Sequence, residues 1–150
     1  MRFVKNRYPV ILWLALLAGL FTAAGGTITP VIAQNAEAET ECDIHEGPCS
    51  LDLDGREVKL EISPKPVKAM KDLTFTVEVS GPALSDPPHI DLDMPDMEMG
   101  RNRVEMKEQD ENTYTGTGVI VKCPSGKKTW QAVITIPETG KAAFVFDVVY

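Results

Sequence analysis

The sequence predicts an all-β domain, an immunoglobulin-like antiparallel β-sandwich of about seven strands, behind an N-terminal signal or anchor helix. Three observations support this prediction. After residue 41, apolar and polar residues alternate in short runs, which is the pattern of half-buried strands. Turn-forming residues separate these runs at intervals of roughly a dozen residues. The span 42–150 has the usual size of an immunoglobulin-like domain, roughly a hundred residues.

The N-terminal segment predicts export. Its start is basic and free of acids, and residues 9–33 carry no charge. Val31 and Ala33 satisfy the small-x-small rule, so residues 1–33 read as a secretory signal cleaved after Ala33. The alternative is an uncleaved membrane anchor through residues 10–33, because the uncharged stretch is long enough to span a bilayer. Both alternatives predict a periplasmic or otherwise extracytoplasmic domain, and the second anchors it in the inner membrane.

The net charge of the exported part excludes some classes of partner. Residues 34–41 read as a polar linker. The chain has a net charge of −7, and its first 33 residues contribute +3, which leaves −10 for the remainder. Such an acidic domain repels phosphate backbones and anionic lipid surfaces, so we expect no nucleic-acid partner.

The expected strands follow from period-two patterns, such as Val58, Leu60 and Ile62 on one face of "REVKLEIS". In chain order the expected strands are residues 56–63, 73–80, 89–94, 103–109, 113–121, 129–136 and 141–150. The turn signals "SPKP", "GPALSDPP", "EQDEN", "CPSGKK" and "PETG" separate them. Trp130 and Met106 are expected in the core, and Met70 in a loop or at an edge.

Three cysteines, Cys42, Cys49 and Cys123, are disulfide candidates, because an oxidising compartment favours pairing two of them. A Cys42–Cys49 bond would close a small local loop. A Cys49–Cys123 bond would tie the start of the domain to its far half. The remaining thiol would be free, intermolecular or a metal ligand.

Catalytic motifs are missing from the sequence. It has no Gly-x-Ser-x-Gly, no His-Glu-x-x-His and no glycine-rich phosphate loop, and its only histidines are His45 and His89. "CDIHEGPC" loosely resembles a zinc site, but a disulfide competes with zinc for these cysteines. We therefore expect no enzyme and no catalytic residues.

The segment "HIDLDMPDMEMG" contains three methionines, Met94, Met97 and Met99. Thioether sulfur is a soft, neutral ligand that suits Cu(I), and it forms no disulfides. Met97 and Met99 are two apart and are expected to project together. A turn at Pro95 would bring Met94 back toward Met97.

Two further residues are candidate ligands of the same copper ion. His89 faces away from Met94 on the expected strand and joins the site only if the chain bends. Cys123 approaches the methionines if both loops lie at one end of the sandwich. The alternative interpretation makes Met97 and Met99 ordinary core or interface residues, with Asp96 and Glu98 in solvent.

Several segments together resemble the YtkA-like domain family. They are "SPKPVKAMKDLTFTVEVSG", "IDLDMPDMEMG", "ENTYTGTGVIV" and "TWQAVITI", within residues 57–149. These exported or membrane-anchored immunoglobulin-like domains are similar to FixH-type proteins and to periplasmic copper-resistance sandwiches. The resemblance implies copper handling or assembly of copper oxidases, and it carries a metal-binding role onto Met94 and Met97, with Met99 extending the pattern. This chain departs from the family in its three cysteines and its "CPSG" turn.

We therefore predict an exported copper-binding accessory protein, either a Cu(I) chaperone or an assembly factor for a copper enzyme. Its expected partner is a copper enzyme or a membrane protein. The alternative is a non-metal protein-interaction domain of an envelope complex, in which the methionine face is an adaptable contact surface.

Overall fold

The computed structural model of this chain describes residues 42–150, so the predicted signal or anchor (1–33) and linker (34–41) lie outside the described residues. Residues 42–150 form nine strands and no helix. The strands are β1 (Cys49–Leu53), β2 (Arg56–Ser63), β3 (Asp72–Val79), β4 (His89–Asp93), β5 (Arg103–Glu105), β6 (Lys107–Asp110), β7 (Thr113–Val119), β8 (Thr129–Ile136) and β9 (Gly140–Asp147). Within this part of the chain, no helix is long and apolar enough to cross a membrane.

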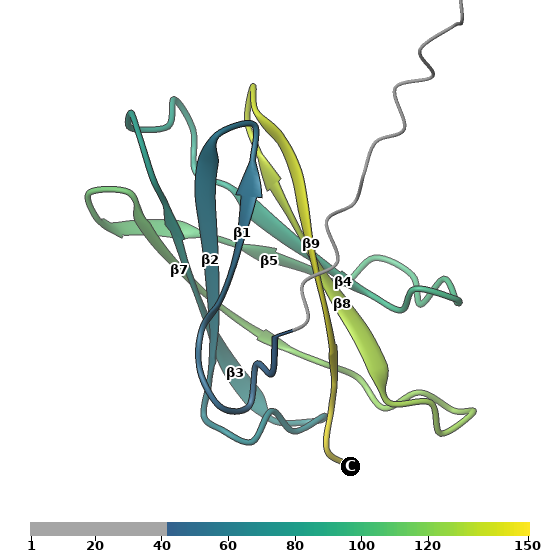
Figure 1. Cartoon of the computed structure of the whole chain (residues 1–150). Helices are drawn as coiled ribbons and strands as arrows, with labels where there is room; N and C mark the ends of the chain where they lie inside the picture. Colours follow the sequence, from purple (N-terminus) through teal and green to yellow (C-terminus); the bar gives the residue numbers. More distant parts are fainter. Residues whose placement is uncertain (1–41) are drawn as a thin grey trace, which may run out of the picture. The chain divides into compact units, whose positions relative to one another are not determined.

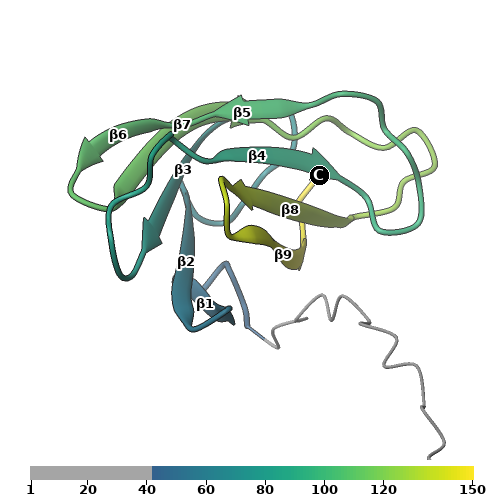
Figure 2. The same ribbon diagram turned by 90° about the horizontal axis from the view of Figure 1, so that it is seen from above.

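The nine strands form two antiparallel sheets that pack as a β-sandwich (Figures 1 and 2). One sheet has the order β1-β2-β3-β7-β6, and the other has the order β5-β4-β8-β9. This arrangement confirms the prediction of an all-β antiparallel sandwich. The strand count is higher than predicted because β1 was not expected and the expected strand 103–109 forms two strands.

The core lies between the sheets and follows the predicted alternation. In β2, β3 and β8 every second residue is buried. Trp130, Tyr114 and Phe75 are the bulkiest of the fully buried side chains. Met106 is buried, as predicted, and Met70 is 63% exposed, which confirms its loop position. Burial of this apolar surface is the main stabilising contribution to such a fold.

The chain changes sheets at Met106. β5 pairs with β4, whereas β6 pairs with β7 in the opposite sheet. A Cβ atom at Gly116 would lie 2.7 Å from Val104 Cγ1 and 2.8 Å from Met106 Sδ. The absent side chains of Gly116 and Gly118 on β7 therefore let the crossing segment lie close to that strand. The prediction of one continuous strand over 103–109 was wrong, because the chain moves from one sheet to the other at Met106.

One end of the sandwich gathers the segments that the sequence singled out. β4 ends there, β8 begins there, and Asp93 pairs with Gln131 next to this end. The segment after β4 also reaches the opposite sheet, where Asn102 Nδ2 donates to the Val119 carbonyl at 3.0 Å. The methionine segment and the loop between β7 and β8 are therefore neighbours.

Candidate functional site

The methionine segment forms a tight turn directly after β4. Met94 and Met97 form an isolated antiparallel bridge, and the Met97 N–H donates to the Met94 carbonyl at 3.3 Å. Pro95 and Asp96 occupy the two exposed central positions of this turn. Proline suits the first central position, because its fixed φ matches the turn. The predicted turn at Pro95 that returns the chain toward Met94 is therefore confirmed.

Asp93 holds the segment closed. Its Oδ1 accepts hydrogen bonds from the Met94 N–H at 2.8 Å and from the Met99 N–H at 3.1 Å. One carboxylate thus ties the first and last methionines of the segment to the end of β4. We call residues 94–99, closed in this way, the methionine loop. The sequence interpretation missed Asp93, although a short acidic side chain at a strand end commonly bonds nearby backbone.

The three methionines differ in burial. Met94 is 3% exposed and belongs to the core. Met97 and Met99 are half-buried and pack against the same core, while Asp96 and Glu98 between and beside them are exposed. Two methionines of the loop are therefore partly accessible, and the third is buried. No strand continues through residues 98–102, so turn geometry and the Asp93 bonds, rather than a strand, organise this face.

His89 lies away from the methionine loop. It begins β4 and shares the outer face with Asp91 and Asp93, whereas Met94 faces the core. Five residues of extended strand span roughly 16 Å. The His89 Nε2 lies 3.6 Å from Asp91 Oδ2, so the ring faces a carboxylate rather than a sulfur. The chain shows no bend that brings His89 to the methionines.

Asp91 on this outer face is held by Arg103 of β5, which donates to it twice, at 2.7 and 2.9 Å. The Arg103 hydrogen bond lowers the pKa of the Asp91 carboxyl below its ordinary value, against the opposing effect of burial. This pair fastens the short edge strand β5 to β4.

Cys123 is buried and unpaired in the loop between β7 and β8. Its Sγ lies 3.0 Å from Ser125 Oγ, and its N–H donates to the Tyr150 hydroxyl at 3.1 Å. The Tyr150 hydroxyl in turn donates to the Lys127 carbonyl. The hydrogen bond with Ser125 is the main cause that lowers the pKa of the Cys123 thiol, with backbone N–H groups of the same turn adding to it. The C-terminal tyrosine thus closes the turn around this thiol.

A cavity separates the methionine loop from the loop between β7 and β8. Its volume is about 490 Å³, and Lys127 Nζ lies 3.7 Å from Asp96 Oδ2. The residues lining the cavity are Met94, Pro95, Asp96, Lys127, Lys128, Thr129 and Val145. The two loops therefore meet the condition stated for Cys123, that both lie at one end of the sandwich, but Lys127 and Lys128, and not Cys123, line the cavity with Met94.

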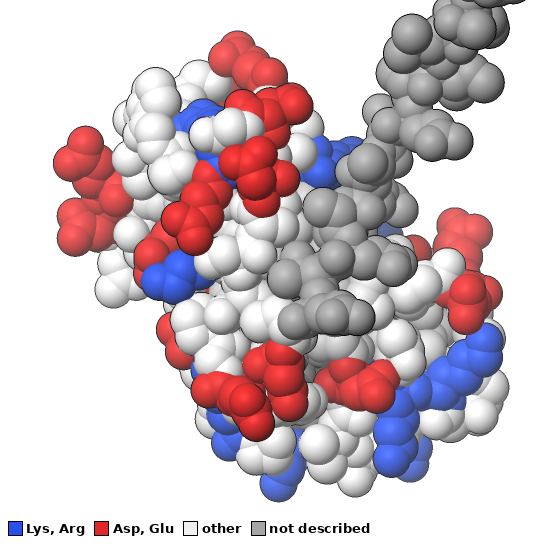
Figure 3. All heavy atoms as spheres, in the orientation of Figure 1, with Lys and Arg blue, Asp and Glu red and all other residues white. Residues whose placement is uncertain are grey.

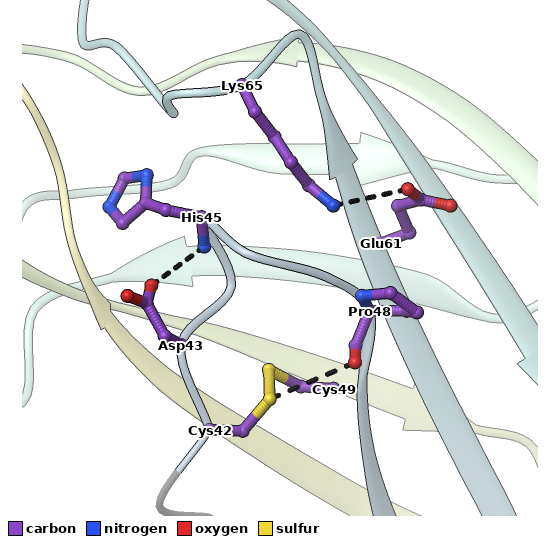
Figure 4. Close-up of a disulfide and its surroundings, with 7 residues drawn as sticks. All are labelled: Cys42, Asp43, His45, Pro48, Cys49, Glu61 and Lys65. Atoms are coloured by element: carbon purple, nitrogen blue, oxygen red, sulfur yellow. Dashed lines mark hydrogen bonds and ion pairs between the residues drawn. A yellow bond between two sulfur atoms is a disulfide. The ribbon is translucent and has the colours of Figure 1, made fainter.

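The disulfide joins Cys42 to Cys49 at the start of the domain (Figure 4). This settles the pairing in favour of the local loop and excludes a bond between Cys49 and Cys123. His45 fixes the loop to the sandwich. Its Nδ1 accepts from the Val67 N–H at 3.0 Å, so Nε2 carries the proton and donates to the Asp147 carbonyl at 2.8 Å.

These contacts leave no zinc site in "CDIHEGPC", because both sulfurs are in the disulfide and both imidazole nitrogens bond to backbone. Among residues 42–150, no three His, Cys, Asp or Glu side chains are grouped to hold a metal ion. Methionine is not one of these ligand types, so the methionine loop is assessed by its own geometry.

The chain matches no known protein-family model and no curated protein sequence.

Proposed function

We propose that this protein is an exported copper-binding accessory protein, a Cu(I) chaperone or an assembly factor for a copper enzyme, with the methionine loop as its metal site. The observation that carries the proposal is the closed loop in which Asp93 bonds the backbone of both Met94 and Met99. Three thioethers within six residues form a soft, neutral ligand set suited to Cu(I). In this proposal the partly accessible Met97 and Met99 would bind the ion together with the buried Met94.

Transfer would proceed by ligand exchange at a shallow site. Met97 and Met99 are half-buried, so a partner's sulfur ligands can reach the ion without the sandwich opening. Cys123 is the candidate fourth ligand, because it is an unpaired thiol in the adjacent loop. His89 stays outside the ligand set because it lies on the other face of β4.

We extend the proposal to the cellular location and the family of this protein. We infer an immunoglobulin-like domain of the YtkA-like type, directed to the periplasm by residues 1–33 and either released there or anchored in the inner membrane. The Cys42–Cys49 disulfide is consistent with an oxidising compartment. There methionine ligands keep their coordinating ability, whereas exposed thiols oxidise. The partner would be a copper enzyme or a membrane protein that receives the ion.

The test is an anaerobic competition titration of Cu(I) against a chromogenic chelator. The proposal predicts about one Cu(I) per chain, lost when Met97 and Met99 both become Ile. Met70→Leu is the control, because Met70 is an isolated exposed thioether whose positive φ of 59° disfavours a β-branched replacement, and this variant keeps its copper. Trp130 is the only tryptophan of residues 42–150, and it adjoins Gln131, which pairs with Asp93 directly before Met94, so its fluorescence gives a second readout of binding. A double variant that still binds one Cu(I) would show that the methionine site is wrong.

A second candidate function is a non-metal interaction domain of an envelope complex. The half-buried Met97 and Met99 favour it, because flexible thioether side chains adapt to a contacting surface. This candidate predicts a partner that stays bound in chelator-containing buffer.

A further inference from the structure

The cavity between the methionine loop and the β7–β8 loop has a two-part lining. Met94, Pro95 and Val145 supply apolar surface, and Lys127 and Lys128 supply positive charge. The Thr129 hydroxyl is already engaged, since it donates to Asp147 Oδ1 at 2.7 Å. A ligand for this cavity therefore needs an apolar group for its floor and an anionic group for its lysines.

The lysines are available to an incoming anion. Lys127 meets Asp96 at 3.7 Å, but the two side chains are 51% and 81% exposed, and such pairs contribute little. Lys128 forms no ion pair with any carboxylate of residues 42–150. A partner carboxylate can replace Asp96 on Lys127 at little cost and can add a new pair with Lys128.

The charge around the cavity contrasts with the rest of the domain. The stretch 113–137 contains Lys122, Lys127 and Lys128 and no acid, in a chain whose net charge is −7. In Figure 3, lysine and arginine side chains gather at the lower right, where Figure 1 places the β7–β8 loop, while acidic side chains dominate the upper part of this face. The lysines of this loop therefore form the basic side of the cavity, opposite Asp96 of the methionine loop, and would attract an acidic partner.

We propose that this cavity docks an acidic peptide segment of a partner protein, with one apolar side chain on Met94 and Val145 and flanking carboxylates on Lys127 and Lys128. The inference goes beyond both candidates of the preceding subsection and requires neither copper nor Met97 and Met99. The apolar contact supplies affinity, and the carboxylates supply orientation and rate of encounter. If copper also binds, a partner seated here lies beside the methionine loop.

The test uses the full chain in chelator-containing buffer and two hexapeptide probes. One probe has five acidic residues and a central leucine, and the other has serine in place of the leucine. We expect amide NMR shifts at residues 94, 96, 127–129 and 145 with the leucine probe, weaker binding of the serine probe, and affinity that falls as salt is added.

The lysines are tested by paired charge reversal. Lys127→Glu with Lys128→Glu should weaken binding of the leucine probe about tenfold. The control, Lys68→Glu with Lys71→Glu, makes the same change in net charge at two other exposed lysines and should change affinity less than about twofold. A Lys127→Gln and Lys128→Gln variant, which removes the charges without reversing them, should fall between the two.

Several results would overturn the proposal. They are no binding of the leucine probe, shifts centred elsewhere, or an equal loss in both charge-reversed variants. A peptide-free dimer that only the Lys127 and Lys128 reversal dissociates would assign the cavity to a second copy of this chain instead. The Met97→Ile and Met99→Ile variant separates the two proposals, because it should keep peptide binding whether or not the wild-type chain binds copper.

Discussion

Replacing Asp93 by Ala would remove the contact that closes the methionine loop. The substitution deletes the acceptor of two hydrogen bonds, those from the Met94 N–H at 2.8 Å and the Met99 N–H at 3.1 Å. Asp93 is half-buried, so water can replace part of each bond, and about 1 kcal/mol apiece is the appropriate scale. We therefore expect a loss of about 2 kcal/mol in the free energy of unfolding. If copper binding must restore the closed loop, Cu(I) affinity falls by at most about thirtyfold.

Urea unfolding followed by Trp130 fluorescence measures the first quantity, and chelator competition measures the second. Asp93→Asn is the informative companion, because its amide oxygen still accepts both bonds and should restore much of the loss. Glu98→Ala is the control within the loop, since its exposed side chain forms no hydrogen bond with the other residues of 42–150. If Asp93→Ala unfolds at the wild-type urea concentration and binds copper as tightly, then Asp93 does not organise the loop.

Three further perturbations test the fold around the site. Gly116→Ala places a Cβ 2.7 Å from Val104 Cγ1 and should destabilise the domain by about 1–3 kcal/mol in urea; an unchanged midpoint would contradict the close crossing at Met106. Replacing Cys42 and Cys49 by Ala opens a loop of sequence separation 7 and should cost roughly 2–3 kcal/mol, whereas equal stability with and without reductant would argue against the disulfide. The pKa of Asp91 is lower in the folded chain than in the unfolded chain, so ionised Asp91 stabilises the fold at neutral pH. This stabilisation is lost below about pH 4, as the pH falls through the pKa of the folded chain. Asp91→Asn should therefore flatten the acid limb of the stability profile by less than about 1 kcal/mol, since this pair is partly exposed; an unaltered limb would assign the slope to other carboxylates.

The sequence predicted the strands whose alternation is long and whose ends carry turn residues. Residues 56–63 and 129–136 match β2 and β8 in full. It could not predict the change of sheet at Met106. Val104 and Met106 keep period two because both face the core, so one strand and two strands on opposite sheets have the same apolar pattern. The strand β1 was missed although the residues of "CSLDL" alternate between apolar and polar, because the run is only five residues long.

The candidate site was predicted in part. The turn at Pro95 and the outward direction of His89 follow from local geometry, and both were predicted. The role of Asp93 in closing the loop was not predicted. Asp93 alternates with other acidic residues, which suggested a solvent-exposed side chain, and its hydrogen bonds to the backbone are visible only in the structure. The lysines opposite Met94 come from a segment some thirty residues later, and only the sheet register brings Lys127 within reach of Asp96.

X-ray absorption at the copper edge tests the central claim most directly, because it identifies the atoms bound to the ion in the Cu(I)-loaded full chain. Copper in the methionine loop has a first shell of sulfur, which is lost in the Met97→Ile and Met99→Ile variant and retained in Met70→Leu. A first shell of nitrogen and oxygen, or a sulfur shell that survives the double change, would contradict the assignment of copper to Met94, Met97 and Met99.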